Sequence, residues 1–353
     1  MNKKLVLPLL LVVQFLLLKF LSFFPEFVER YYSNGFYPVL SRISRITLGK
    51  IPFSVGDLIY GIVIFLLLRW FWNKRKTWKT AWKDNLLSLI GFVSVFYFLF
   101  NLLWGINYIR VPLYQKLKLE RDYSMEELIR FTERVIIKVN TIHSQIEKND
   151  SLKVTVPYTR DQIFEKTING YGHLAKTFPF FSYRHKSVKA SLISTPLTYM
   201  GFSGYLNPFT NEAQVNDLIP LPNFATTTCH EMAHQIGYAS ESEANFIGYM
   251  ASIHNDDIYF QYSGYTYALR YCLHNIELKQ EGGSEALLPL IHPGVLANFK
   301  DSDTFWDSHQ NFMEPLFKVF YDHFLKINQQ KDGMESYSKF VDLLIHYYRE
   351  KPL

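Results

Sequence analysis

Long apolar runs occupy the first third of the chain and give way to mixed sequence after about residue 110. Three of these runs approach the length of about 20 residues that a helix needs to cross a bilayer. They cover about residues 5–22, 57–72 and 86–104. Aromatic residues gather at their ends, as they do at membrane interfaces: Trp70, Trp72, Trp104 and Tyr108. The pattern predicts a membrane domain of residues 1–110 with three transmembrane helices.

The first apolar run could also be a signal peptide. However, no small-x-small cleavage pattern precedes Pro25, because the residues before it are Ser22, Phe23 and Phe24. We therefore expect a retained membrane anchor.

Basic residues predict how the chain is oriented in the membrane. The loop between the second and third runs holds five of them: Lys74, Arg75, Lys76, Lys79 and Lys83. Such loops stay in the cytoplasm, which predicts a multi-pass cell-membrane protein with a cytoplasmic N-terminus and an extracytoplasmic domain after Tyr108. The loop 25–56 is then external although it carries four basic residues, and its aromatic and apolar content indicates a segment lying along the interface.

After Pro112 the pattern is that of a globular domain, residues 111–353, which we expect to be α+β and helix-rich. Ser124 and Glu127 form a capping box that predicts a helix to about Glu147. Other helices are expected over about residues 161–177, 265–280, 314–327 and 333–347. Strands are expected over residues 187–194 and within 199–215, with Gln214–Asn216 as an edge that could pair with an extended substrate.

Residues His230 to His234 read H-E-x-x-H. On a helix, positions i and i+4 share a face, so His230 and His234 can bind one zinc ion between them. Glu231 then lies beside the metal, where a base is needed to take a proton from water. Gly237 favours the end of this helix and a turn back toward the site.

The third zinc ligand is less directly specified. A catalytic zinc needs three protein ligands, and Glu241 and Glu243 both precede an apolar helix that reaches about Ile253. We favour Glu241, because Asn245 follows one turn later on the same face and could hold a ligand from behind. Glu243 lies about 200° around the helix and remains the alternative ligand. Either carboxylate could instead simply stabilise the helix N-terminus.

Hydrolysis also needs a group that stabilises the oxyanion. Tyr337 is a candidate because it follows a glycine-containing turn, and four other residues share the required chemistry: Tyr267, His274, His323 and His346. The two cysteines leave two alternatives open: Cys229 and Cys272 form a disulfide, or Cys229 is a buried free thiol beneath the site. A net charge of +5 and the lack of any nucleic-acid motif predict no nucleic-acid partner.

The H-E-x-x-H pattern with a glutamate on the next helix resembles the gluzincin metallopeptidases. Only six residues separate His234 from Glu241, which is far fewer than in thermolysin-like gluzincins. The chain as a whole resembles an uncharacterised family of bacterial membrane proteins, the domain of unknown function 3810, notably over Ile51–Asp57 and Gly333–Leu344. That resemblance implies membrane spans combined with an extracytoplasmic, zincin-like H-E-x-x-H domain.

These patterns together predict a membrane-anchored metallopeptidase that uses Zn2+ to hydrolyse peptide bonds. Its partners would be a peptide or protein substrate and the lipid bilayer. The alternative is a non-catalytic, zinc-binding membrane sensor or scaffold of zincin fold. An intramembrane protease is disfavoured, because His230 lies far from every predicted span.

Overall fold

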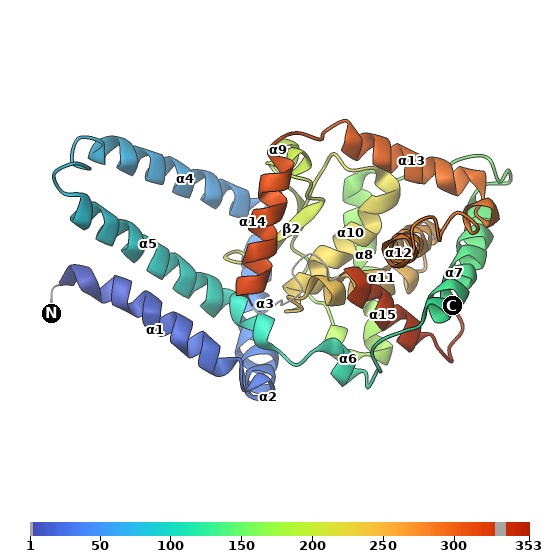
Figure 1. The fold of residues 1–353 in the computed structure, drawn as a ribbon, viewed down its shortest axis with the longest axis horizontal. Helices are drawn as coiled ribbons and strands as arrows, with labels where there is room; N and C mark the ends of the chain where they lie inside the picture. Colours follow the sequence, from blue (N-terminus) through green and yellow to red (C-terminus); the bar gives the residue numbers. More distant parts are fainter. Residues whose placement is uncertain (1–2, 329–336) are drawn as a thin grey trace.

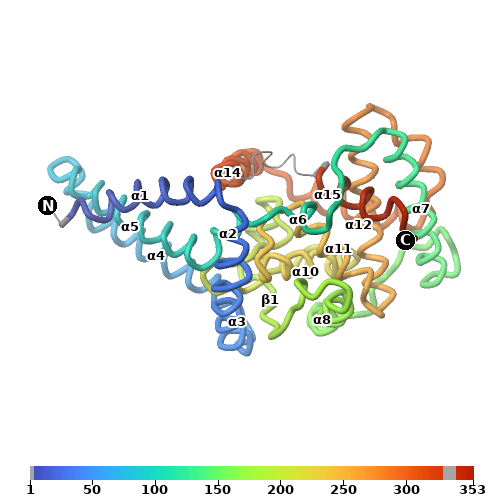
Figure 2. Tube along the Cα trace, turned by 90° about the horizontal axis from the view of Figure 1, so that it is seen from below, coloured from blue at the N-terminus to red at the C-terminus, as the bar shows by residue number. Residues whose placement is uncertain are grey.

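The computed structural model describes residues 3–328 and 337–353, and it is helix-rich, with 69% of the chain helical. One end of the elongated molecule consists of long helices from the N-terminal third, and the other end is a compact domain (Figure 1). The N-terminus and the α4–α5 connection both lie at the tip of the helical end (Figures 1 and 2).

Two of the described helices are long and apolar enough to cross a membrane, namely α4 (Val55–Lys74) and α5 (Trp82–Leu103). A third candidate span is α1 (Val6–Leu21), which passes the same test together with the following helical segment, Pro25–Leu48, after a bend of 103°. The three apolar runs therefore do form helices, and these provide two to three candidate membrane spans.

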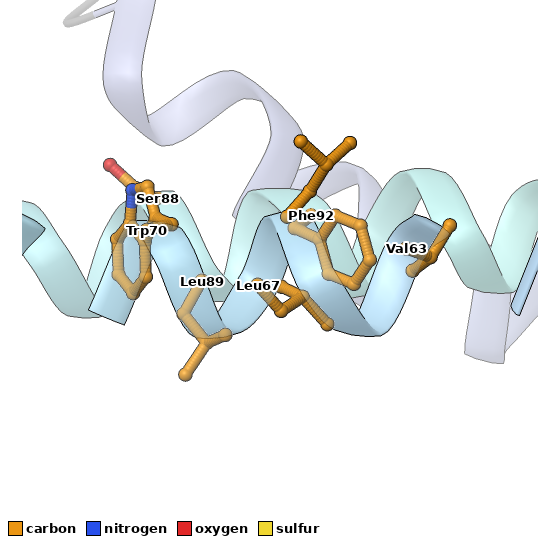
Figure 3. A pocket seen from close by; sticks show the side chains of 7 residues that line it. Val63, Leu67, Trp70, Ser88, Leu89 and Phe92 are labelled. Carbon is orange, nitrogen blue, oxygen red and sulfur yellow. The ribbon is translucent and has the colours of Figure 1, made fainter. Parts of the chain in front are cut away.

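An apolar groove of about 280 Å³ separates α4 from α5 (Figure 3). Its lining comes from both helices and includes Val63, Leu67, Trp70, Ser88, Leu89 and Phe92. The Ser88 hydroxyl already donates to the backbone oxygen of Asp84 at 2.8 Å. The groove therefore offers a mainly apolar surface.

The segment between α1 and α4 folds back as three short helical pieces: α2 (Pro25–Val28), a π-helix (Glu29–Phe36) and α3 (Tyr37–Leu48). Helix α3 turns its polar side inward, where Ser41 and Arg45 are buried. Its apolar side is exposed, through Val39, Ile43 and Ile46. This inverted pattern suits a helix that packs on a polar protein surface and presents its other face to a membrane interface.

Helices make up most of the compact domain. The Ser124 capping box is confirmed: the Ser124 hydroxyl accepts from the Glu127 amide, and the Glu127 carboxylate accepts from the Ser124 amide. Beyond the site helices described below, the α-helices of this domain are α6 (Leu113–Lys116), α7 (Met125–Ile146), α8 (Arg160–Thr177), α9 (Ser194–Tyr199), α12 (Ile258–Lys279), α13 (Pro293–Asp307), α14 (Glu314–Ile327) and α15 (Tyr337–Tyr347). Along the described chain, short 3-10 turns also cover Lys3–Leu5, Gly105–Ile109, Pro179–Phe181 and Leu288–Leu290.

A small sheet contains three strands: β1 (Val188–Ala190), β2 (Gly204–Asn207) and β3 (Glu212–Val215). Their order is β1-β3-β2, with β1 parallel and β2 antiparallel to β3. The expectation that Gln214–Asn216 forms an edge is therefore wrong, because Gln214 pairs with Lys189 on one side and with Tyr205 on the other. The sequence pattern predicted strands in this region but could not predict their order in the sheet, since that order depends on which strand lies in the middle. It also missed α9, which lies between β1 and β2.

The segment before α4 and the first turn of α4 are bound to the small sheet of the compact domain. The Lys189 ammonium is buried, forms an ion pair with Glu212 and donates to the backbone oxygens of Leu48 and Phe53, both at 2.9 Å. The Gly56 amide donates to the other Glu212 oxygen at 2.6 Å. The predicted boundary at residue 110 divides the sequence into an apolar part and a mixed part. In the folded structure, residues from both sides of this boundary pack together.

Candidate metal centre

Helix α10 (Leu221–Gln235) carries both histidines of the motif and ends just after the second one. Gly237 terminates it with a φ of +88°, in the left-handed region that favours glycine. The Gly237 amide donates to the His234 oxygen at 3.0 Å and the Tyr238 amide donates to the Ala233 oxygen at 3.2 Å. This pair of bonds is a Schellman motif, which confirms the predicted helix end at Gly237.

Helix α11 (Glu241–Ile253) starts directly after this turn and packs very closely against α10. Its Gly248 lies against the backbone of α10 at His230. A Cβ atom at Gly248 would lie only 2.8 Å from the backbone nitrogen of His230 and 2.9 Å from its Cα. Because glycine lets the two backbones touch here, the first residue of α11 comes within reach of the histidines.

Three side-chain atoms from α10 and α11 converge. His230 Nε2 and His234 Nε2 are 3.1 Å apart, and Glu241 Oε2 lies 3.3 Å from the first and 3.7 Å from the second. A tetrahedral zinc ion with bonds of about 2.0–2.1 Å holds its ligand atoms about 3.3 Å apart. The donor set and its spacing therefore fit a zinc ion.

Glu231 is buried beside the two histidines. Its ligand atom and theirs all lie within 4.8 Å of one another. On its other side it faces β2, because a Cβ atom at Gly204 would lie 2.7 Å from Glu231 Oε1. Burial raises the pKa of Glu231 to about 7, although positive charge on His230 and His234 opposes this shift. Among the described residues, Glu231 Oε2 has no hydrogen-bond partner, so one carboxylate oxygen is left to interact with a bound molecule.

Two further contacts fix how the converging groups are oriented. His234 Nδ1 lies 2.7 Å from the Tyr238 backbone oxygen. Because a carbonyl only accepts, Nδ1 carries the hydrogen and the Nε2 lone pair points at the site, as is usual for metal-binding histidines. The Tyr321 hydroxyl of α14 donates to Glu241 Oε1 at 2.6 Å, which leaves Oε2 facing the histidines.

The backbone oxygens at the end of α10 accept hydrogen bonds from the N-terminal third of the chain. The donors are Trp104 Nε1 to His234 at 3.1 Å, the Tyr37 hydroxyl to Gln235 at 2.8 Å and Arg110 Nη1 to Gly237 at 2.7 Å. These contacts satisfy carbonyls that a helix C-terminus leaves unpaired. These N-terminal segments thus hold the turn that carries the chain from His234 to Glu241.

The alternative ligand Glu243 lies in a different environment. It is buried, and its Oε1 accepts from the Leu113 amide at 2.6 Å. Burial raises its pKa, although that hydrogen bond and the charge of Arg110 oppose the shift. The structure therefore places Glu241 on the histidines and Glu243 beneath α6. Asn245, expected behind a ligand, instead bonds to Tyr267 at 2.6 Å and to Tyr271 at 3.4 Å.

Two of the oxyanion candidates, His323 and His346, contact residues outside the converging group. Tyr337 begins α15, but its side chain lies outside the described residues. His323 is exposed on α14, where its Nδ1 contacts the Val319 backbone oxygen, and His346 contacts Asp342. Sequence reasoning missed Tyr321, although it lies within the helix that was expected over residues 314–327. Nothing local distinguishes it among the 24 tyrosines of the chain.

The two cysteines do not pair. Cys229 and Cys272 are both free and buried, and burial raises the pKa of each thiol to about 12. Cys229 is therefore an inert thiol beneath the site.

The molecule is thus a helix-rich protein with two to three candidate membrane spans and a candidate metal centre on two closely packed helices. The chain belongs to the family described as "Protein of unknown function (DUF3810)", whose model matches residues 32–345. The match includes α4, α5 and every residue of the metal centre. No curated protein and no solved structure matches the chain.

Proposed function

We propose that this protein is a membrane-anchored zinc metallopeptidase in which His230, His234 and Glu241 bind the metal. The observation that carries the proposal is the triangle formed by their three ligand atoms, with sides of 3.1, 3.3 and 3.7 Å. A carboxylate beside such a triangle distinguishes a hydrolytic centre from a structural zinc site, which needs no base. Glu231 occupies that place.

When bound, the zinc ion would polarise a substrate carbonyl and make a neighbouring water more acidic. Glu231 would accept a proton from the attacking water and return it to the departing amine. Its burial next to Gly204 of β2 excludes bulk water from one side of the carboxylate. Tyr321 would keep Glu241 in its ligand orientation through the hydrogen bond to Oε1.

Strand β2 is the element best placed to bind a substrate backbone. It is an edge strand of the sheet and carries Gly204 against Glu231. An extended peptide added to this edge would bring a scissile bond near the metal centre. A cavity of about 340 Å³ lies beside it, lined in part by Phe202, Trp306 and Lys318, and could hold a substrate side chain. The sheet beside the H-E-x-x-H helix also supports a zincin-like arrangement.

The membrane orientation belongs to the same proposal. The basic loop between α4 and α5 and the N-terminus share one end of the molecule, opposite the metal centre (Figure 1). With that loop in the cytoplasm, the compact domain is extracytoplasmic, and the spans hold it at the membrane surface.

The first test uses Glu231→Gln in the full-length protein, purified in detergent. We expect unchanged zinc content and loss of cleavage of an internally quenched peptide library, because Gln cannot accept the proton. Full activity of this variant would refute the mechanism. If the wild-type protein binds zinc but cleaves no library member, the non-catalytic sensor or scaffold is favoured instead.

The second test compares Glu241→Gln with Glu243→Gln, two substitutions that differ only in position. We expect the first to lower zinc affinity at least tenfold and the second to leave it unchanged, since Glu243 contacts Leu113. Loss of affinity in the Glu243 variant alone would assign the third ligand to that residue. Unchanged affinity in both variants would remove the carboxylates from the ligand set.

A further inference from the structure

A second cluster of potential ligands lies far from the first centre. It consists of His143 on the last turn of α7, Asp150 in the following turn and His292 at the N-cap of α13. Figure 1 shows the end of α7 and the start of α13 meeting at the side of the molecule opposite the spans. His143 is fully buried, whereas the side chains of His292 and Asp150 are 21% and 57% exposed. Solvent therefore reaches the cluster from one side.

The spacing of the three ligand atoms matches that of a metal site. His292 Nδ1 lies 3.2 Å from His143 Nδ1 and 3.4 Å from Asp150 Oδ1, and each of the three residues offers a ligand atom within 4.8 Å of the others. The two distances from His292 are close to the separation of about 3.3 Å between ligands of a tetrahedral zinc ion.

The orientation of His143 is set from behind. Its Nε2 lies 2.8 Å from the backbone oxygen of Leu152, which can only accept a hydrogen bond. Nε2 therefore carries the hydrogen, and Nδ1 directs a lone pair toward His292 and Asp150. A histidine held by a carbonyl in this way is the usual partner arrangement of a metal ligand.

Backbone packing holds the other two groups in place. A Cβ atom at Gly294 would lie 2.0 Å from the Leu152 oxygen and 2.6 Å from His143 Nε2, so only glycine lets α13 start this close to α7. The Gly294 amide donates to the Asp150 backbone oxygen at 2.8 Å, and the His292 amide donates to Asn140 Oδ1 at 3.0 Å. Three separate segments are thereby fixed around one point.

We propose that His143, Asp150 and His292 form a second binding site for a divalent transition-metal ion, with Zn2+ as the best match to two imidazoles and one carboxylate. The ion would join the end of α7 to the start of α13, and solvent would complete its coordination from the open side. The competing arrangement has no metal: the Nδ1–H of His292 is shared between His143 and Asp150 as an ordinary hydrogen bond.

The test separates this site from the first one. In full-length protein carrying His230→Ala and His234→Ala, we expect one equivalent of zinc after dialysis, measured by elemental analysis. Adding His292→Gln should remove it, and adding Asp150→Asn should weaken it at least tenfold in titrations with Zn2+ alone. His323→Ala, at an exposed histidine on α14, is the matched control and should retain the equivalent.

Cobalt substitution supplies a readout that does not depend on activity. Co2+ in the His230→Ala, His234→Ala protein should give the visible absorption of tetrahedral nitrogen and oxygen coordination, and His292→Gln should abolish it. A protein that keeps its circular dichroism but binds no zinc or cobalt would overturn the proposal, as would binding that survives both His292→Gln and Asp150→Asn. Because the first-site histidines are absent, neither result depends on the proposed peptidase function.

Discussion

The close contact between α10 and α11 leads to a prediction for Gly248→Ala. The added Cβ would lie 2.8 Å from the backbone nitrogen of His230, whereas ordinary van der Waals contact begins at 3.4 Å. The neighbouring atoms belong to helix backbone and cannot rotate away, so the two helices must separate by about 0.6 Å, the difference between these distances. Overpacking a tight core in this way costs about 1–3 kcal/mol of unfolding free energy.

The same shift should weaken metal binding. Glu241 lies on α11 and the histidines lie on α10, so separating the helices moves the carboxylate relative to both imidazoles. A displacement of about 0.6 Å exceeds the tolerance of about 0.2 Å for zinc–ligand distances. We therefore expect Gly248→Ala to lose stability and zinc affinity together.

The chain offers a matched control in Gly172 on α8. This glycine is exposed, and a Cβ atom there would meet nothing within 4 Å. Gly172→Ala should stabilise the protein by about 0.5–1 kcal/mol, because alanine is the better helix residue. Thermal unfolding and a zinc titration against a chelator, both in detergent, measure the two effects. If Gly248→Ala matched wild type in both assays, the helix contact would not set the metal geometry.

Two further predictions concern α14. Tyr321→Phe removes the hydrogen bond to Glu241 and should lower zinc affinity about 10–100-fold in the same chelator competition; equal affinity would show that Tyr321 does not orient this ligand. Helix α14 contacts the end of α5 through Phe324 and Phe100, and its Leu316, Phe320 and Ile327 are 61–68% exposed, so a spin label at Phe320→Cys in nanodiscs should be accessible to oxygen. A label at Lys318→Cys, whose side chain is 53% exposed, should favour a water-soluble relaxing agent, and identical profiles at both positions would argue against a lipid-facing side of α14.

Local sequence patterns predicted those helices whose ends depend on a single local feature, such as a capping residue or a glycine. The helix that begins at Ser124 follows from a capping box, and the end of α10 follows from the positive φ that Gly237 adopts without strain. Helix α14 was expected over Glu314–Ile327, the range it occupies, because its apolar positions recur with helical spacing. The apolar runs likewise became long helices, since their hydrophobicity is continuous.

Features that depend on long-range contacts could not be predicted from local sequence patterns. The order of strands β1, β3 and β2 depends on which strand enters the middle, and alternation along each strand is the same in either case. The inward polar face of α3 is likewise explained only by the buried partners it meets, such as Asn211 for Ser41 and Tyr183 for Arg45.

The sequence alone identified the two histidines, because a spacing of four residues on a helix places them on one face whatever surrounds them, and it placed Glu231 directly beside His230. It also limited the candidates for the proposed third ligand to two glutamates. Only the tertiary structure separated them: a contact as close as that at Gly248 brings Glu241 to the histidines and directs Glu243 to Leu113. The reason is physical, since a ligand set depends on distances of a few tenths of an ångström between helices, and no local pattern encodes such distances.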